Sequence, residues 1–207
     1  MADSGLVHVI DDDEAMRDSL AFLLKASSLE VRTYESATAF LSGLKDRPRG
    51  CVVTDIRMPG MSGIDLLRSL AEVKYDIPVI VITGHGDIPL AVEAMKLGAF
   101  EFLEKPFEDR RILTAIRSAL ERSREVGERA NEISAIAERL ASLSQRERQV
   151  LDGLVAGHPN KTIAFDLGIS PRTVEVYRAN VMDKMQANSL SDLVRMVLVC
   201  KGTETGA

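Results

Sequence analysis

Cysteine and histidine are scarce in this chain of 207 residues, which has two cysteines and three histidines. Cys51 and Cys200 lie in apolar stretches far apart in the sequence. We therefore expect both thiols to be reduced and buried, as is usual in cytoplasmic proteins. This small supply of ligands does not suggest a zinc site.

Long hydrophobic runs are also missing. No apolar run approaches the roughly 20 residues that cross a bilayer, and the opening MADSGLVHVIDDDE lacks the basic and apolar regions of a signal peptide. We expect a cytoplasmic protein without a membrane anchor. A G-x-x-x-x-G-K-[ST] loop is absent from the sequence, which disfavours an enzyme that cleaves nucleotides.

The first half of the sequence alternates between strand patterns and helix patterns. Its apolar runs are continuous, which is typical of parallel strands buried on both faces. The alternation predicts an α/β doubly wound, five-stranded parallel sheet. The predicted strands are Val7–Ile10, Val31–Tyr34, Cys51–Thr54, Val79–Ile82 and Phe100–Leu103. The predicted helices are Glu14–Ala26, Ala37–Leu44, Ile64–Glu72, Pro89–Leu97 and a helix from Glu108 onward.

Acidic and polar side chains follow the carboxyl ends of these strands. Three acids, Asp11 to Asp13, follow the first strand, Asp55 follows the third, Thr83 the fourth and Lys105 the fifth. Ligands of an open parallel sheet bind beyond these ends, where the strand order reverses. Clustered carboxylates repel one another unless a cation is present, and oxygen ligands alone favour Mg²⁺. With a lysine and a hydroxyl as donors, the set indicates a phosphoryl-acceptor site.

Four separated motifs, "VIDDDE", "VVTDIRMPGMSG", "VITGHGD" and "FLEKPF", resemble the signature of response-regulator receiver domains over about residues 6–120. The resemblance implies a role for each matching residue. Asp55 would accept the phosphoryl group, and Thr83 and Lys105 would contact it. Phe102 would be the aromatic switch, and the Lys105–Pro106 bond would be cis. Mg²⁺ would be held by Asp11, Asp12, Asp55 and the backbone carbonyl of Arg57.

Simpler readings remain open for some of these residues. Asp13 is better explained as the N-cap of the first helix than as a metal ligand, and Phe102 could equally be a plain core aromatic. An aspartyl-phosphate phosphatase would carry a second acid two residues after its nucleophile, where this sequence has Arg57. We therefore predict a switch that holds the phosphoryl group and not an enzyme that turns over.

A long proline-free segment follows the predicted sheet. From Arg110 to Arg139 apolar residues recur at spacings of four and three, which is a heptad pattern. We predict a helical linker at residues 123–141, between a receiver at 1–122 and a second domain at 142–207. A solvated spacer and a paired coiled coil are equally compatible with the pattern. The pattern positions are Ile112, Ile116, Ala119, Ser123, Val126, Ala130, Ile133, Ala137 and Leu140.

The last 60 or so residues predict an all-α, four-helix domain with a helix-turn-helix. Ser144 to Glu147 form a capping box, Asn160 or a neighbour caps the second helix, and Ser170 with Pro171 opens the third. At 100° per residue, Val174, Tyr177, Val181 and Met185 of this third helix face inward. The opposite face, which we expect to read base edges in the major groove, carries Arg172, Glu175, Val176 and Ala179. Thr173, Arg178, Lys184 and Lys161 are expected to contact phosphates or flank this face.

Charge is distributed unevenly between the halves. The whole chain has a formal net charge of −5, which on average argues against nucleic-acid binding. Residues 144–201 carry eight basic and six acidic side chains, a net charge of +2. This segment resembles the LuxR/NarL-type DNA-binding domain over about residues 140–201, although some members of that family have lysine where Glu175 and Ala179 stand. A helical protein-docking module is the alternative for this segment.

Together the two resemblances imply a two-component response regulator. Its expected partners are a sensor histidine kinase, double-stranded promoter DNA and RNA polymerase, with nitrogen-fixation or microaerobic genes as implied targets. We predict that phosphorylation shifts the balance between two states of the protein and drives homodimerisation through Val92 and Lys96. The core face of the helix that carries them is expected to be Ile88, Ala91 and Met95. A phosphorelay protein that acts only through protein contacts is the second hypothesis.

Overall fold

The protein is described by a computed structural model that covers residues 5–43, 49–84 and 88–204. It divides into two compact units, Met1–Gly127 and Glu128–Ala207. This division falls inside one continuous helix, so the boundaries at 122 and 141 stay predictions. No helix within the described ranges combines the length and apolarity needed to cross a membrane.

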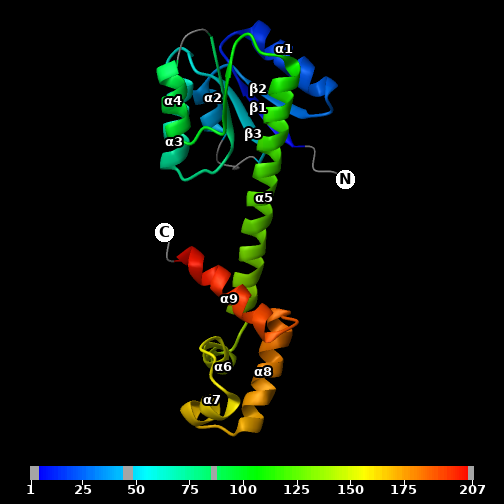
Figure 1. The fold of residues 1–207 in the computed structure, drawn as a ribbon, viewed down its shortest axis with the longest axis vertical. Helices are drawn as coiled ribbons and strands as arrows, with labels where there is room; N and C mark the ends of the chain where they lie inside the picture. Colours follow the sequence, from blue (N-terminus) through cyan, green and yellow to red (C-terminus); the bar gives the residue numbers. More distant parts are fainter. Residues whose placement is uncertain (1–4, 44–48, 85–87, 205–207) are drawn as a thin grey trace. The chain divides into compact units, whose positions relative to one another are not determined.

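A five-stranded parallel sheet with the order β2-β1-β3-β4-β5 forms the first unit (Figure 1). Each strand begins and ends within one residue of its predicted bounds, and the predicted fold class is confirmed. The order reverses between β1 and β3, which places the switch point beside these two strands. The strands are β1 (Leu6–Ile10), β2 (Glu30–Tyr34), β3 (Cys51–Asp55), β4 (Val79–Thr83) and β5 (Glu101–Glu104).

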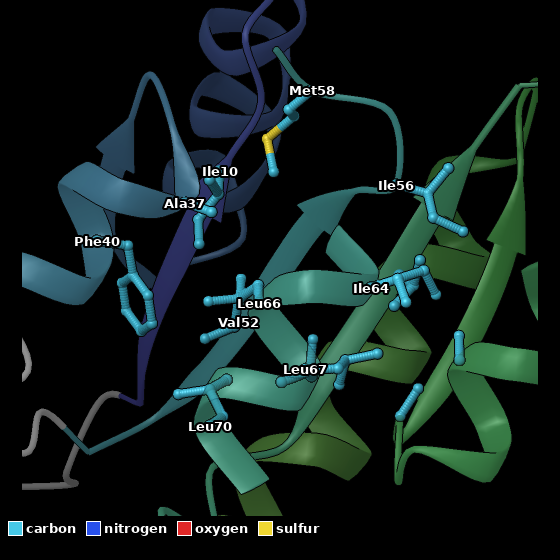
Figure 2. Close-up of a cluster of buried hydrophobic side chains, with 14 of the residues drawn as sticks. Ile10, Ala37, Phe40, Val52, Ile56, Met58, Ile64, Leu66, Leu67 and Leu70 are labelled. Carbon is cyan, nitrogen blue, oxygen red and sulfur yellow. The ribbon is translucent and has the colours of Figure 1, made fainter. Parts of the chain in front are cut away.

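Helices cover both faces of the sheet, and a hydrophobic cluster fills each interface. The helices are α1 (Glu14–Ala26), α2 (Ala37–Ser42), α3 (Gly63–Glu72), α4 (Ile88–Lys96) and the start of α5 (Asp109–Ala141). One cluster joins the sheet to α2, α3 and α4, with Phe40, Val52 and Leu66 among its fully buried side chains (Figure 2). The other cluster joins the opposite face to α1 and α5 through residues such as Leu24 and Ile116. The predicted end of the second helix at Leu44 lies outside the described residues.

The core face of α4 differs from the prediction. Ala94 is fully buried, whereas Met95 is half exposed, so the assignment of Met95 to the core is wrong. Leu90 and Leu97 pack on the same cluster as Ala94, so the core face of this segment lies one position away from the predicted one. Val92 is also half exposed, and Lys96 is exposed, in keeping with the outward orientation expected for both.

The long helix α5 uses most of its heptad pattern within its own chain. Ile112, Ile116 and Ala119 are buried in the core of the first unit. Ile133 and Leu140 pack on the core of the second unit, where the buried α5 residue is Ile136. Ile136 lies outside the predicted seam, and the seam positions Ala130 and Ala137 are exposed. Pairing of this seam with a second helix stays a prediction.

Four further helices make up the second unit, as predicted: α6 (Gln145–Val155), α7 (Asn160–Leu167), α8 (Pro171–Met185) and α9 (Leu190–Glu204) (Figure 1). The Ser144–Glu147 capping box and the Ser170 cap are both present. At α7 the cap is a neighbour of Asn160, the second of the two predicted alternatives, and Asn160 is the first helical residue. Pro159 occupies the cap position and has no side-chain acceptor for the free amides.

Candidate functional site

Three of the predicted residues meet beyond the carboxyl ends of β1, β3 and β5. The Lys105 ammonium donates to Asp55 Oδ1 at 2.7 Å and lies 3.3 Å from Asp11 Oδ2. The acids belong to the two strands that flank the switch point. Asp11 and Asp55 are only 4% and 9% exposed, so a bridging cation is needed to keep two buried carboxylates charged side by side.

Backbone groups hold Asp55 at the end of its strand. The Arg57 amide donates to Asp55 Oδ2 at 2.6 Å, and the Ile56 amide donates to the Ile82 carbonyl at 2.9 Å. Gly63 opens α3 against this turn, and a Cβ atom added there would lie 2.5 Å from the Asp55 carbonyl oxygen. Only glycine allows this approach, so the following loop folds back over the acid.

Burial and charge shift the pKa values of the two partners around Asp55. Burial raises the pKa of the Asp11 carboxyl, although the Asp13 amide and Lys105 oppose the shift. Burial alone would lower the pKa of Lys105, but the hydrogen bond to Asp55 and the two negative charges outweigh it and raise this pKa. The lysine is therefore charged at neutral pH, which suits a group that neutralises an anion.

The remaining predicted residues of this site lie around the acids. Thr83 ends β4 and is buried, and its carbonyl accepts from the Lys105 amide at 2.7 Å. Phe102 is partly buried and packs on the cluster under α4, which is compatible with a core aromatic and with a switch. Asp13 caps α1 by accepting from the Ala15 and Met16 amides, and the Lys105–Pro106 bond is cis, so both predictions are confirmed.

The donor set fits a magnesium ion, although no group of three or more His, Cys, Asp or Glu in the described residues is gathered as a metal cluster. Mg²⁺ is commonly held by one or two carboxylates, with water completing the shell. Asp11 and Asp55 supply the carboxylates, and their bridge by Lys105 shows that the pair attracts a cation. Asp12 is exposed at the rim. The carbonyl of Arg57 stays a prediction as a ligand.

A hollow of about 650 Å³ adjoins this rim. It lies between the β3–α3 loop and α4, so a small phosphoryl donor can reach the edge of the acid site. Its lining includes Asp12, Arg57, Pro59, Arg68 and Leu90.

Sequence reasoning missed Arg17, which lies on α1 next to the acids. Its guanidinium donates to the backbone carbonyls of Asp11 and Asp12 at 2.7 and 3.0 Å. A signal was available in the sequence. A cation near the N-terminus of a helix opposes the helix dipole, so an arginine in the second turn of a helix that follows three acids calls for a local partner.

A second candidate site is the outer face of α8. Val174, Val181 and Met185 are fully buried and Tyr177 packs beside them, so the predicted inward face is confirmed. The opposite face carries Arg172, Glu175, Val176 and Ala179, all exposed. The face expected to read DNA is therefore available, and its base contacts stay predictions.

The polar and charged residues that flank this face differ in whether they already have a partner within the domain. Lys184 donates to the buried Glu147 carboxylate at 2.7 Å, and this bond lowers the pKa of Glu147 to about 2. Arg178 lies 3.5 Å from Asn160 Oδ1, while Thr173 bonds to the Ser170 cap. Lys161 and Arg172 are exposed. Of this predicted phosphate-contact set, Lys184 already has a partner within the domain.

Two family models match the chain in the order of its two units. The response regulator receiver domain matches residues 7–117, and the luxR family of bacterial regulatory proteins matches residues 141–197.

Full-length relatives support both matches. The transcriptional regulatory protein FixJ of Azorhizobium caulinodans is 61% identical over 96% of this chain and 94% of its own length. The solved structure of the response regulator StyR has a TM-score of 0.85 at 43% identity, covering 94% of this chain and 98% of StyR. Full-length FixJ from B. japonicum has a TM-score of 0.59 at 54% identity, covering 96% and 98%.

Proposed function

Because the chain belongs to the two-component response regulators that join a receiver domain to a LuxR-type DNA-binding domain, we propose that Asp55 accepts a phosphoryl group from a sensor histidine kinase and that this event controls promoter binding. The observation that carries the proposal is the Lys105 ammonium bridging Asp55 and Asp11. A buried acid with a paired cation beside it, at the switch point of the sheet, is an arrangement suited to phosphoryl transfer.

The chain's own groups divide the transfer among them. An oxygen of Asp55 attacks the phosphorus while the bond to the kinase histidine breaks, and the Arg57 amide keeps the other oxygen in place. Lys105 moves its charge from the carboxylates to an oxygen of the transferred group, and the Thr83 hydroxyl donates to another. Asp11, Asp12, Asp55 and the Arg57 carbonyl would hold a magnesium ion, which would supply positive charge to neutralise the phosphoryl oxygens. Asp55 then holds the group, so the protein acts as a switch and not as an enzyme with turnover.

The output of this switch is a shift between populated states. Movement of Thr83 toward the phosphoryl group frees the space into which Phe102 rotates, which alters the surface of α4 and β5. The exposed Val92 and Lys96 on α4 support a phosphorylation-dependent homodimer there. Paired recognition helices would strengthen the modest affinity expected from a domain with few net positive charges.

The exposed outer face of α8 supports DNA as the output partner over a phosphorelay that acts only through protein contacts. The protein is proposed to act in the cytoplasm, as a transcriptional regulator that works with RNA polymerase. The relatives named FixJ are transcriptional regulatory proteins, which supports this role.

The test compares the wild-type chain with Asp55→Asn after incubation with acetyl phosphate and Mg²⁺. We expect incorporation of one phosphoryl group, dimerisation in sedimentation and tighter, salt-dependent promoter binding in the wild type alone. Labelling of the variant at the wild-type level would place the acceptor elsewhere. DNA binding that ignores both salt and phosphorylation would favour the phosphorelay.

A further inference from the structure

The β1–α1 loop that carries Asp11 and Asp12 is held by a side chain with no predicted role. Arg17 lies in the second turn of α1 and is partly buried. Its Nη1 nitrogen donates to the Asp11 carbonyl at 2.7 Å and to the Asp12 carbonyl at 3.0 Å. One charged nitrogen thus bridges two successive peptide groups between β1 and α1.

The location of Arg17 opposes a positive charge in two ways, although the neighbouring carboxylates of Asp11 to Asp13 favour one. It places a positive charge near the N-terminus of α1, where the helix dipole disfavours cations. It also brings that charge close to the proposed metal ligands, where it would repel a divalent cation. A guanidinium kept there must therefore be compensated, and charge-assisted hydrogen bonds to two carbonyls provide compensation.

Fixing the carbonyls also restricts the direction of the carboxylates. The Asp11 and Asp12 side chains leave the same short backbone segment whose peptide planes Arg17 fixes. Asp11 is further held because its Oδ1 accepts from the Asp13 amide at 2.9 Å. Asp12 is exposed, so it depends more on the backbone for its orientation.

We propose that Arg17 is a positioning residue for the magnesium-binding loop and increases the affinity of the site for Mg²⁺ despite its own positive charge. The inference rests on the proposed function, since it concerns the metal that assists phosphorylation of Asp55. It predicts the direction in which the affinity for Mg²⁺ changes when the arginine is replaced. Loss of a merely nearby charge would tighten Mg²⁺ binding, whereas loss of a positioning group weakens it.

The test measures Mg²⁺ binding to the unphosphorylated full-length chain by calorimetric titration, in the wild type and in Arg17→Ala. Residues that orient metal ligands typically contribute 10- to 100-fold in affinity, so we expect a dissociation constant about 10-fold higher in the variant. Arg17→Lys should recover most of the affinity, because an ammonium can donate to the same two oxygens. Lys25→Ala removes one positive charge from the exposed end of the same helix and should leave the affinity unchanged.

A second measurement follows acetyl phosphate incorporation as a function of magnesium concentration. We expect Arg17→Ala to raise the magnesium concentration at half-maximal rate while the rate at saturating magnesium stays near the wild-type value. If Arg17→Ala does not fold, Arg17→Met removes both the charge and the hydrogen-bond donor while keeping the aliphatic stem, and serves with the same expected outcomes.

Equal or tighter Mg²⁺ binding in the neutral variant would overturn the proposal for Arg17. The wild-type chain separates this failure from failure of the proposed function. If the wild type incorporates phosphate at Asp55 and the Arg17 variant binds Mg²⁺ as tightly as the wild type, only the proposed role of Arg17 is refuted. If the wild type incorporates no phosphate, the proposed function is refuted together with the role of Arg17.

Discussion

Replacing Lys105 by methionine should destabilise the first unit in the absence of metal and do so much less in its presence. Methionine keeps the length of the aliphatic stem and removes the charge. Asp11 and Asp55, both nearly buried, would then face each other with no cation between them. Magnesium would replace the missing charge, so the variant should lose more stability without the metal than with it.

The size of the effect follows from the two contacts. At 2.7 and 3.3 Å and an effective dielectric constant of about 20, each attraction is worth roughly 5 to 6 kcal/mol before desolvation. Desolvation of the ammonium offsets much of this, and breaking a buried pair typically costs about 3 to 5 kcal/mol. The lysine side chain is 24% exposed and one acid can take up a proton, so we expect a loss of about 2 to 3 kcal/mol at pH 7.5. Mg²⁺ at 100 times its dissociation constant stabilises a chain that binds it by about 2.7 kcal/mol. The deficit of the variant should shrink because it lacks the ammonium that repels the ion, and so binds Mg²⁺ more tightly than the wild type does.

The assay is amide hydrogen exchange of β1 and β3 in the full-length chain, with and without Mg²⁺, for Lys105→Met and the wild type. Lys25→Met, a change at an exposed lysine of α1, is the matched control and should lose less than about 1 kcal/mol. The metal-free deficit of Lys105→Met should shrink between pH 7.5 and 5, because burial raises the pKa of the Asp11 carboxyl in the folded state and the folded variant gains a proton there before the unfolded chain does. Equal losses with and without Mg²⁺ would refute the electrostatic reasoning.

Three further changes probe other contacts of the fold. Gly63→Ala should lower the free energy of unfolding by about 2 kcal/mol or more in calorimetry, because its Cβ would lie 2.5 Å from the Asp55 carbonyl oxygen. The control is Gly84→Ala, whose Cβ would meet nothing within 4 Å and which should leave the stability unchanged. Burial lowers the pKa of His8. The unfolded chain therefore takes up the proton first, and stability should decline as the pH falls below about 6.5. His8→Phe should flatten this decline, and an unchanged dependence of stability on pH would exclude His8 as its source. The pKa of Glu147 is lowered to about 2, so the stability that its charge contributes is complete above about pH 4.5 and is lost as the pH falls toward 2. Glu147→Gln should lower the melting temperature of the second unit at pH 7 but not at pH 2. Equal melting temperatures of variant and wild type at pH 7 would contradict the role of the ion pair with Lys184.

The sequence predicted those features that local chemistry determines. The bounds of β1, β3 and β4 were accurate because each of these buried apolar runs ends at or before a polar or charged residue, as β3 does at Asp55. The Asp13 and Ser170 caps were predictable because a cap bonds to amides two or three residues away. The meeting of Asp11, Asp55 and Lys105 followed from the rule that ligands gather at one edge of a parallel sheet.

Features that depend on packing between distant segments were missed or wrong. Met95 was assigned to the core by helical spacing, but the face that packs on the cluster carries Leu90, Ala94 and Leu97. Lys184 was assigned to phosphate contact, and nothing in its neighbourhood along the sequence indicated its bond to Glu147, 37 residues away. The contacts of Arg17 were also missed, because they are made by backbone carbonyls, which every residue carries.

The packing of α5 bears on whether its middle is a solvated spacer or part of a paired coiled coil. A coiled coil needs apolar residues that remain available for a partner helix. The first third of the pattern is buried in one core, and Ile133 and Leu140 of its last third pack on another. Ser123 accepts a hydrogen bond from the Gly50 amide at 3.3 Å. The positions left over are Val126, Ala130 and Ala137, and one valine with two alanines gives a partner helix little to bury. The solvated spacer is therefore the better reading of the middle of α5, which leaves the surface of α4 as the site where dimerisation is to be sought.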